Sequence, residues 1–269
     1  YSLNELSNDI TGAIPASFEP TIDYIVTKVP RFTFEKFPDT SPLLTTSMKS
    51  VGEAMAIGRC FAESLQKALR SLETGLTGLN EISLNPEENL DYHSRDDLKT
   101  ALISPRPDRL LVVAQAFREG MPLKEIHDAC KIDPWFLRQI EDIVNLEQDL
   151  RRNGIHSEDT DLANLKRMGF SDERLAEICS LDISVITETR RKGDIFPVYK
   201  RIDTCAAEFL SDTPYMYSTY ESDGFSSKFC ESNPTSREKI IILGGGPNRI
   251  GQGIEFDYCC CHAAFALSE

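Results

Sequence analysis

The middle of the chain follows a helical pattern of apolar and polar positions. One apolar face begins near residue 60 and is followed by Gly75, which we expect to end that helix. A further helix is predicted from Asp108 through Phe117, with Gly120 closing it. Another should begin at Asp133, because Asp caps free backbone amides and the next residue, Pro134, is favoured at the first helical position. The first face consists of Phe61, Leu65, Ala68, Leu69 and Leu72. The middle region is therefore predicted to be a helical domain.

A weak internal repeat lies within this helical region. The first copy contains Gly120, Ile126, Cys130, Ile132, Asp133 and Phe136, and the second contains Gly169, Leu175, Cys179, Leu181, Asp182 and Val185. Each copy predicts a short helix, a tight turn and a second helix. Such pairs are either helix-turn-helix DNA readers or packed helical hairpins. Because the formal charge of −14 would repel a phosphate backbone, we favour hairpins, with Trp135 and Phe136 as core anchors.

Extended patterns precede and follow the helices. The alternation from Ile22 to Phe34 predicts a strand in a region rich in proline. Near the other end, Lys239 to Leu243 has the unbroken apolar character of a central parallel strand, and Phe256 to Leu267 follows as an apolar helix. Between them lie an irregular aromatic segment after Gly193 and a polar stretch, Ser222 to Ser236, predicted to be a linker.

Both ends of the chain have the pattern of incomplete structural units. Leu3, Leu6 and Ile10 have helical spacing from the first residues onward. At the other end, a single strand, a turn and one helix cannot form a sheet without further strands. We therefore expect the chain to be a piece from the middle of a larger protein.

Composition excludes several classes of protein. No apolar stretch reaches the roughly 18 residues of a membrane span and no signal peptide is present, so we expect a soluble, cytoplasmic protein without a membrane partner. All eight cysteines are expected to be thiols, with Cys259, Cys260 and Cys261 in a buried cluster. Four adjacent side chains from Cys259 to His262 would point all round a helix, so no metal site is expected. The acidic charge also argues against nucleic-acid binding.

The most specific chemical pattern is KIIILGGGPNRIGQGIEFD, from Lys239 to Asp257. A strand, a glycine turn and a helix can present free amides to an anion. The dinucleotide fingerprint G-x-G-x-x-G matches Gly244 and Gly246 but fails at Arg249, and the Walker pattern lacks its Gly-Lys-Ser/Thr ending. The residues alone leave a structural turn and a ligand contact equally open.

Long motifs along the whole chain resemble one enzyme family. The run GGGPNRIGQGIEFDYCC is similar to the opening of the second synthetase half of the carbamoyl phosphate synthetase large subunit. Four further segments resemble the same family: SFEPTIDYIVTKVPRF at Ser17 to Phe32, MKSVGEAMAIGR at Met48 to Arg59, PVYKRIDTCAAEF at Pro197 to Phe209 and TPYMYSTYE at Thr213 to Glu221. They follow the family's order, and the helical middle from about Cys60 to Arg191 is the least distinctive part.

The resemblance implies a ligase that makes carbamoyl phosphate from bicarbonate, ammonia and two ATP for arginine and pyrimidine biosynthesis. A separate glutaminase small subunit would supply the ammonia. The first ATP-grasp half would form carboxyphosphate and then carbamate, and the second would phosphorylate the carbamate. The implied cofactors are ATP and Mg²⁺ or Mn²⁺, whose ligands should lie outside this chain. We therefore expect no catalytic residue and no bound cofactor here.

The resemblance also implies a mainly α fold, in which a helical oligomerisation domain is flanked by truncated α/β pieces of the two ATP-grasp halves. Residues 1–59 would be the C-terminal remnant of the first (carboxyphosphate) synthetase domain. Residues 60–221 would be the helical oligomerisation domain with its trailing segment, and 222–236 a linker. Residues 237–269 would be the first βα unit of the second (carbamoyl phosphate) synthetase domain. Self-association through the helical domain is expected.

Three residues match positions that line the family's internal passage for carbamate: Arg249, Gly253 and Glu255. A passage needs small residues for width and polar residues to guide an anion. Arg249 and Glu255 could instead pair with each other or with a neighbouring domain. For the chain as a whole, the alternative function is a standalone helical interaction or DNA-binding module, which the repeated hairpins suggest.

Overall fold

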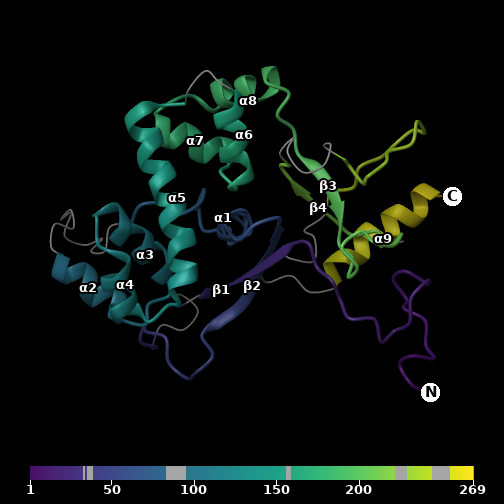
Figure 1. Ribbon diagram of the computed structural model, residues 1–269, viewed down its shortest axis with the longest axis horizontal. Coiled ribbons are helices and arrows are strands. Elements are labelled where there is room, and N and C mark those ends of the chain that lie inside the picture. The colour runs from purple at the N-terminus through teal and green to yellow at the C-terminus, as the bar shows by residue number, and fades with distance from the viewer. Residues whose placement is uncertain are drawn as a thin grey trace.

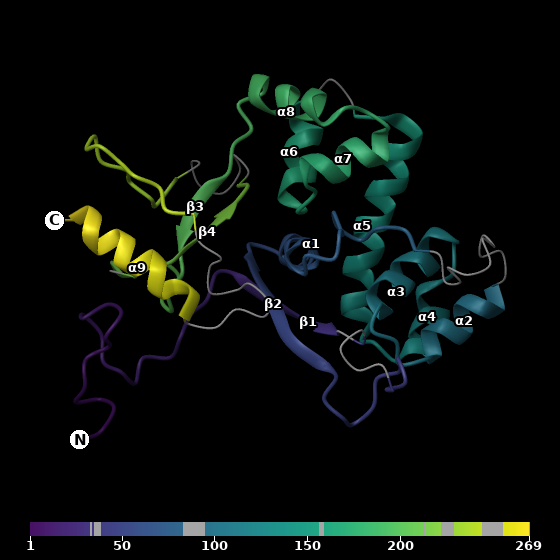
Figure 2. The same cartoon turned by 180° about the vertical axis from the view of Figure 1, so that it is seen from behind.

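The computed structural model is rich in helix and has two small two-stranded sheets, as Figure 1 and the reverse view in Figure 2 show. It describes residues 1–32, 34, 39–82, 95–155, 159–211, 213–221, 229–243 and 255–268. Its strands are β1 (Ile25–Phe32), β2 (Ser50–Gly58), β3 (Val198–Arg201) and β4 (Met216–Thr219). Its helices are α1 (Phe61–Ser71), α2 (Arg95–Ile103), α3 (Arg109–Arg118), α4 (Leu123–Cys130), α5 (Pro134–Asn153), α6 (Asp159–Arg167), α7 (Asp172–Cys179), α8 (Ile183–Lys192) and α9 (Glu255–Ser268). This helix-rich class agrees with the mainly α prediction.

The first sheet, formed by β1 and β2, packs against the first helix, α1. β1 and β2 pair antiparallel, and their register shifts between Arg31 and Phe32. Helix α1 packs against both strands and also against α5. The predicted helix from residue 60 is confirmed, but it ends at Ser71, before Gly75, because Glu73 already adopts a left-handed φ of 54°. The strand expected within residues 22–34 is likewise confirmed for the residues of β1.

The two copies of the internal repeat are helical hairpins. Helices α4 and α5 form the first and α7 and α8 the second. In each, a left-handed residue ends the first helix: Lys131 with φ 59° and Ser180 with φ 54°. An aspartate then caps the second helix, since the side chain of Asp133 accepts a hydrogen bond from the N–H of Trp135 and that of Asp182 from the N–H of Ser184. The predicted cap at Asp133 and the predicted hairpins are confirmed, and Asp182 repeats that cap in the second copy.

Helix α1 holds the entry to the second hairpin through polar contacts. The side chain of Gln66 donates to the carbonyl of Met168 at 2.8 Å, and Arg70 donates to the carbonyl of Gly169 at 2.7 Å. These bonds satisfy carbonyl groups just beyond the C-terminal end of α6. Gly169 has φ 92°, and a Cβ there would lie 2.7 Å from Cα of Glu63. Only glycine therefore fits this close approach of the backbone to α1.

One apolar core runs through the helical region and joins it to the first sheet. It extends from Val29 in β1 through both hairpins to Ile195. Its fully covered members include Leu65 of α1, Ile126 of α4 and Leu175 of α7. The last two occupy the same position in the two copies of the repeat. The hairpins are thus parts of a single helical body that rests on α1 and β1.

The structure corrects the prediction of an irregular segment after Gly193. β3 and β4 pair antiparallel, with Val198 opposite Thr219 and Arg201 opposite Met216. Each strand has only four residues, so the period-two pattern was too short to separate from the surrounding aromatic residues. Of the predicted linker, residues 222–228 lie outside the described residues, and 229–236 contain no helix or strand.

Two further local predictions are wrong. The first ten residues form turns and bends instead of a helix, and Leu3, Leu6 and Ile10 are exposed. Lys239 to Leu243 is not a strand either, with Ile241 82% and Leu243 91% exposed. A central strand needs hydrogen-bonding neighbours on both sides, and within the described residues this segment pairs with none. Its apolar side chains consequently have no layer to pack against.

Helix α9 confirms the apolar helix expected near the end of the chain. All eight cysteines are thiols, also as predicted. Cys259 and Cys261 are however exposed, so the expectation of a buried cysteine cluster is wrong. Most described side chains of α9 are exposed, including Tyr258 and Phe265, because it packs on little of the described chain. In both views α9 lies on the side of β3 and β4 and away from the helical body (Figures 1 and 2).

Candidate functional site

The structure describes only part of the predicted carbamate passage. Arg249 and Gly253 lie outside the described residues. Glu255 is the first residue of α9, and the surroundings of its side chain are likewise not described. The passage therefore stays a prediction, and the site can be built only from the described residues around the helical body.

A buried cluster of charged side chains joins the two hairpins. We call Glu81, Arg118, Glu147 and Arg174 the Glu147 cluster; they come from the segment after α1 and from α3, α5 and α7, respectively. Glu147 is completely buried, and its carboxylate lies 2.7 Å from Nη2 of Arg118 and 2.7 Å from Nη2 of Arg174. Arg174 also donates to Glu81 at 3.0 Å. Each buried charge thus has an opposite charge within hydrogen-bonding distance.

The electrostatics of the Glu147 cluster identify it as structural. Burial lowers the pKa of Arg118, with the positive charge of Arg174 adding to this effect and Glu147 opposing it. An arginine remains protonated under such a shift, so no proton is available for catalysis. Sequence reasoning missed this cluster. The sequence did contain an indication of it, namely a glutamate at a position of the apolar helix face. Glu147 lies on the buried face of α5 with Ile140, Ile143, Val144 and Leu150.

A second polar junction ties the trailing strands to the helical body. The carboxylate of Glu63 accepts hydrogen bonds from the N–H of Arg59 at 2.7 Å and from the hydroxyl of Thr219 at 2.9 Å. It also pairs with Lys67 at 2.7 Å. Glu63 is buried in α1, while Thr219 belongs to β4. Nearby, burial raises the pKa of Tyr217, so this hydroxyl stays protonated.

A third set of charges holds the second hairpin closed. Asp172, at the start of α7, accepts from Nζ of Lys166 at 2.7 Å and from Nε of Arg190 at 3.0 Å. Burial alone would raise the pKa of Asp172, but the hydrogen bonds and charges of Lys166 and Arg190 outweigh it and lower the pKa. The carboxylate therefore remains ionised and links α6, α7 and α8.

Aromatic side chains form an exposed surface beside these buried charges. We call Phe61, Trp135 and Phe136 the aromatic surface. Their ring centroids are 5.5 Å apart for Phe61 and Trp135, 5.3 Å for Phe61 and Phe136, and 5.0 Å for Trp135 and Phe136. Trp135 is 45% and Phe136 43% exposed, so their predicted role as core anchors is wrong. The next residue, Leu137, turns fully inward instead.

The described residues contain no candidate metal site. Among them, no group of three or more His, Cys, Asp and Glu side chains is arranged to hold a metal ion. Nor does any helix in the described ranges have the length and apolar character needed to cross a membrane. The polar clusters described above are ion pairs and hydrogen bonds that join helices to one another and to β4.

Comparison with known proteins identifies the helical region. A family model described as "Carbamoyl-phosphate synthetase large chain, oligomerisation domain" matches residues 53–194, more than half of the chain. The chain belongs to the carbamoyl-phosphate synthetase large-chain family. A second model of the synthetase, described as the carbamoyl phosphate synthase preATP-grasp domain, matches residues 236–269. The oligomerisation-domain match contains the Glu147 cluster and the aromatic surface.

Curated proteins of the synthetase family align with this chain over its whole length. Proteins named "Carbamoyl phosphate synthase large chain" are 60% identical over 270 residues in Brucella melitensis biotype 1 and 60% over 275 residues in Mesorhizobium japonicum. That of Pseudomonas syringae pv. tomato is 57% identical over 272 residues. Each alignment covers 100% of this chain but only 23% or 24% of the relative, so the chain spans about a quarter of their length. None of these matches supports the alternative of a DNA-binding module.

Proposed function

We propose that the chain is an internal segment of a carbamoyl phosphate synthase large chain and that its helical body serves self-association. The observation that carries the proposal is the match of the oligomerisation-domain model to residues 53–194. The preATP-grasp match to 236–269 and the alignments over the whole chain support it. The chain would thus connect two parts of the enzyme and help to assemble its copies.

The proposed organisation keeps the expected boundaries. Residues 1–59 end the first synthetase domain, 60–221 form the oligomerisation domain with its trailing segment, 222–236 are the linker, and 237–269 begin the second synthetase domain. Most residues of the apolar core lie within 60–221, which supports grouping these helices, although the core also includes Val29, Ala54 and Ala56 of the first sheet. The exposure of Ile241 and Leu243 supports a sheet to be completed by strands from the rest of the large chain.

The whole enzyme would be an ATP-grasp ligase of the cytoplasm that makes carbamoyl phosphate for arginine and pyrimidine biosynthesis. It would consume bicarbonate, two ATP and ammonia released from glutamine by the small subunit. Fixed cationic groups and Mg²⁺ or Mn²⁺ would stabilise charge on the transferring phosphoryl group, in sites outside this chain. The family match and the names of the relatives support this activity.

The activity proposal has a direct test. Because the chain is proposed to lack both phosphoryl-transfer sites, the purified chain should show no bicarbonate-dependent ATP hydrolysis. A coupled assay for ADP, with and without bicarbonate, measures this. Bicarbonate-dependent turnover that copurifies with the chain would overturn the assignment of the catalytic groups to the rest of the enzyme.

The carbamate passage through Arg249, Gly253 and Glu255 belongs to the same proposal. A larger side chain at Gly253 would narrow such a passage and slow transfer between the two sites. In the complete large chain, Gly253→Leu should therefore lower the amount of carbamoyl phosphate formed for each ATP hydrolysed. Unchanged stoichiometry would show that this residue does not line the route.

The aromatic surface is the proposed contact between copies. Trp135 and Phe136 are the kind of large apolar side chains that anchor interfaces, and here they lie exposed together on the matched domain. The phenyl ring of Phe61 packs against both and fixes their position. A second copy would cover these rings and remove them from water.

Sedimentation velocity over a range of concentrations tests the contact. The chain should show a concentration-dependent oligomer, and the double variant Trp135→Gln with Phe136→Gln should weaken self-association by at least about tenfold. Tyr215→Gln is the matched control, because Tyr215 is also an exposed aromatic residue but lies beside β4. A monomer at every concentration would contradict self-association, and an unaffected double variant would contradict the assigned surface.

A further inference from the structure

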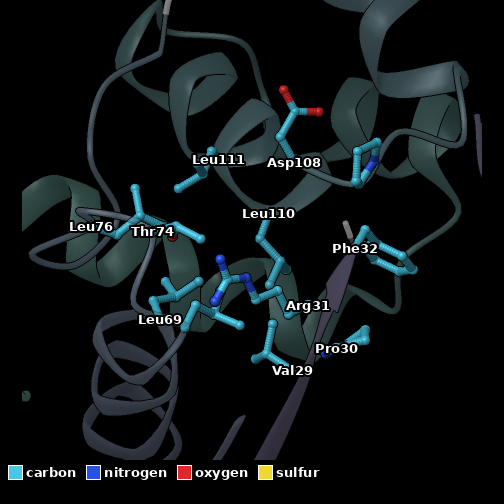
Figure 3. Close-up of a pocket in the computed structure, with 12 residues that line it drawn as sticks. Val29, Pro30, Arg31, Phe32, Leu69, Thr74, Leu76, Asp108, Leu110 and Leu111 are labelled. Atoms are coloured by element: carbon cyan, nitrogen blue, oxygen red, sulfur yellow. The ribbon is translucent and has the colours of Figure 1, made fainter. Parts of the chain in front are cut away.

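A largely apolar cavity lies between β1, α1 and α3, on the side of the helical body that faces the first sheet. Its volume is about 290 Å³, which approaches the size of small-ligand sites. The walls include Val29 of β1, Leu69 and Leu72 of α1, and Leu110 and Leu111 of α3. In Figure 3 the side chains of Val29, Leu69, Leu110 and Leu111 gather around the same space. The cavity contains none of the ion clusters or aromatic rings described above.

One cation projects into this apolar space. Arg31 occupies an inward position of β1, two residues after the buried Val29, where the strand alternation would call for an apolar side chain. In Figure 3 its guanidinium reaches between Leu69 and Leu110. The Arg31 side chain forms no hydrogen bond or ion pair with any residue in the described part of the chain. Its donors are therefore available to a ligand.

The strand is locally shaped to place this side chain. The register of β1 with β2 shifts between Arg31 and Phe32, and Arg31 lies opposite Gly52. The pairing skips Val51 of β2, and an irregularity of this kind bends the paired strands locally. Both Arg31 and the following Phe32 line the cavity, and Gly52 contributes no side chain that would crowd the guanidinium.

The other ionic group of the cavity wall is already neutralised. Asp108 accepts two hydrogen bonds from Arg106, at 2.8 Å and 2.7 Å, and its carboxylate points away from Arg31 in Figure 3. Among the residues that the structure describes, the space therefore combines one unopposed positive charge with apolar walls. This combination selects a ligand with one negative group and an apolar body.

We propose that this cavity binds a small monocarboxylate with an apolar body, whose carboxylate is held by Arg31. A guanidinium matches a carboxylate through two parallel hydrogen bonds, and the leucine walls would cover a branched or aromatic body. The site does not depend on the proposed role of the chain in the synthetase.

Three isosteric probes test the charge preference by calorimetric titration of the whole chain. 3-Phenylpropanoate should bind saturably, 3-phenylpropan-1-ol about tenfold more weakly, and 3-phenylpropylamine not measurably. Equal affinity for the acid and the amine, or no saturable binding of the acid to the folded chain, would overturn the proposal. These measurements use the natural sequence, so they stand even where a variant fails to fold.

Substitutions then locate the site. Arg31→Gln should weaken binding of 3-phenylpropanoate at least about tenfold while leaving the alcohol nearly unaffected. Lys28→Gln is the matched control, because it removes a cation from the same strand. The Lys28 side chain is exposed and paired with Glu53. Leu110→Trp should fill the cavity and abolish binding of both probes. Undiminished binding of the acid by Arg31→Gln or by Leu110→Trp would show that the ligand lies elsewhere.

Discussion

At the scale of single residues, a buried charge in this chain needs a partner of opposite charge, and a close backbone contact needs a residue without a side chain. Glu147 lies on the apolar face of α5, where a carboxylate would be unfavourable, yet two arginines contact it. Gly169 illustrates the second case, because its backbone meets α1 more closely than any side chain would allow. Glu147 joins the two hairpins, and Gly169 brings the second hairpin against α1.

Removing the central charge should strongly destabilise the helical body. Glu147→Gln leaves Arg118 and Arg174 buried beside a neutral group, so we expect a loss of about 3–5 kcal/mol in the free energy of unfolding. Urea unfolding followed by circular dichroism measures it. The exposed pair of Lys124 and Asp128 provides the control, and Asp128→Asn should leave the unfolding midpoint unchanged. Equal effects of the two variants would contradict a structural role for the Glu147 cluster.

A pair of glycine substitutions separates strain from close contact. Gly120 and Gly169 both have positive φ, of 73° and 92°, but a Cβ at Gly120 would meet no atom within 4 Å. We expect Gly120→Ala to cost about 1 kcal/mol and Gly169→Ala roughly 3 kcal/mol, because the latter adds a clash with the α1 backbone. Thermal unfolding compares the two. Equal costs would mean that α1 yields readily to the new methyl group.

At the scale of elements, the helices follow local signals and their pairing follows charges and close contacts. Asp133 and Asp182 begin the second helix of each hairpin as capping chemistry predicts. The repeat itself was visible in the sequence, but the prediction of Phe136 as a core anchor was wrong, since Phe136 and its repeat equivalent Val185 are both exposed. The buried positions are the next residues, Leu137 and Ile186. A shift of one residue rotates a helix face by about 100°, and spacing alone does not resolve it.

The closure of the second hairpin should depend on pH through Asp172. Its pKa is lowered in the folded state, so its stabilising contribution is present above the unfolded pKa and is lost as the pH falls through the folded value. When the pH is lowered from about 6 to about 3, the free energy of unfolding of the natural chain should therefore decrease more than that of the Asp172→Asn variant. Chemical unfolding at each pH gives the comparison. Parallel pH profiles of the two proteins would contradict this role.

At the scale of the whole molecule, a well-packed helical body contrasts with sparsely packed segments near the two ends. The body has a continuous core that includes α1, α5 and α7, whereas α9 and the apolar residues 240–243 are largely exposed. Helix α9 has 14 residues, and an isolated helix of that length is only marginally stable in water. The proposal that the chain is an internal segment of a large chain would account for this contrast, because the curated relatives are about four times as long as the aligned segment.

Hydrogen exchange should report this contrast directly. Amides of α9 should exchange much faster than those in the middle of α5, which buries Ile140, Ile143 and Val144. Mass spectrometry of peptides from the intact chain measures both in one experiment, so α5 is its own control. Comparable protection of the two helices would show that α9 is packed more firmly than its exposed side chains indicate.

The sequence by itself determined the features that depend on near neighbours. Caps such as Asp133, the glycines at hairpin entries and the apolar spacing of α1 act over one or two helical turns, so they can be recognised without a fold. The long family motifs also made the synthetase resemblance recognisable.

Only the tertiary structure decided which groups meet across the chain. The buried arginine partners of Glu147 come from two other helices, α3 and α7, and β3 forms because β4 lies beside it. Ile240 to Leu243 has the composition of a strand but no neighbour among the described residues, so its local preference is not realised. Burial, hydrogen-bond partners and the Arg31 cavity are properties of distant contacts, and a periodic pattern along one segment does not contain them.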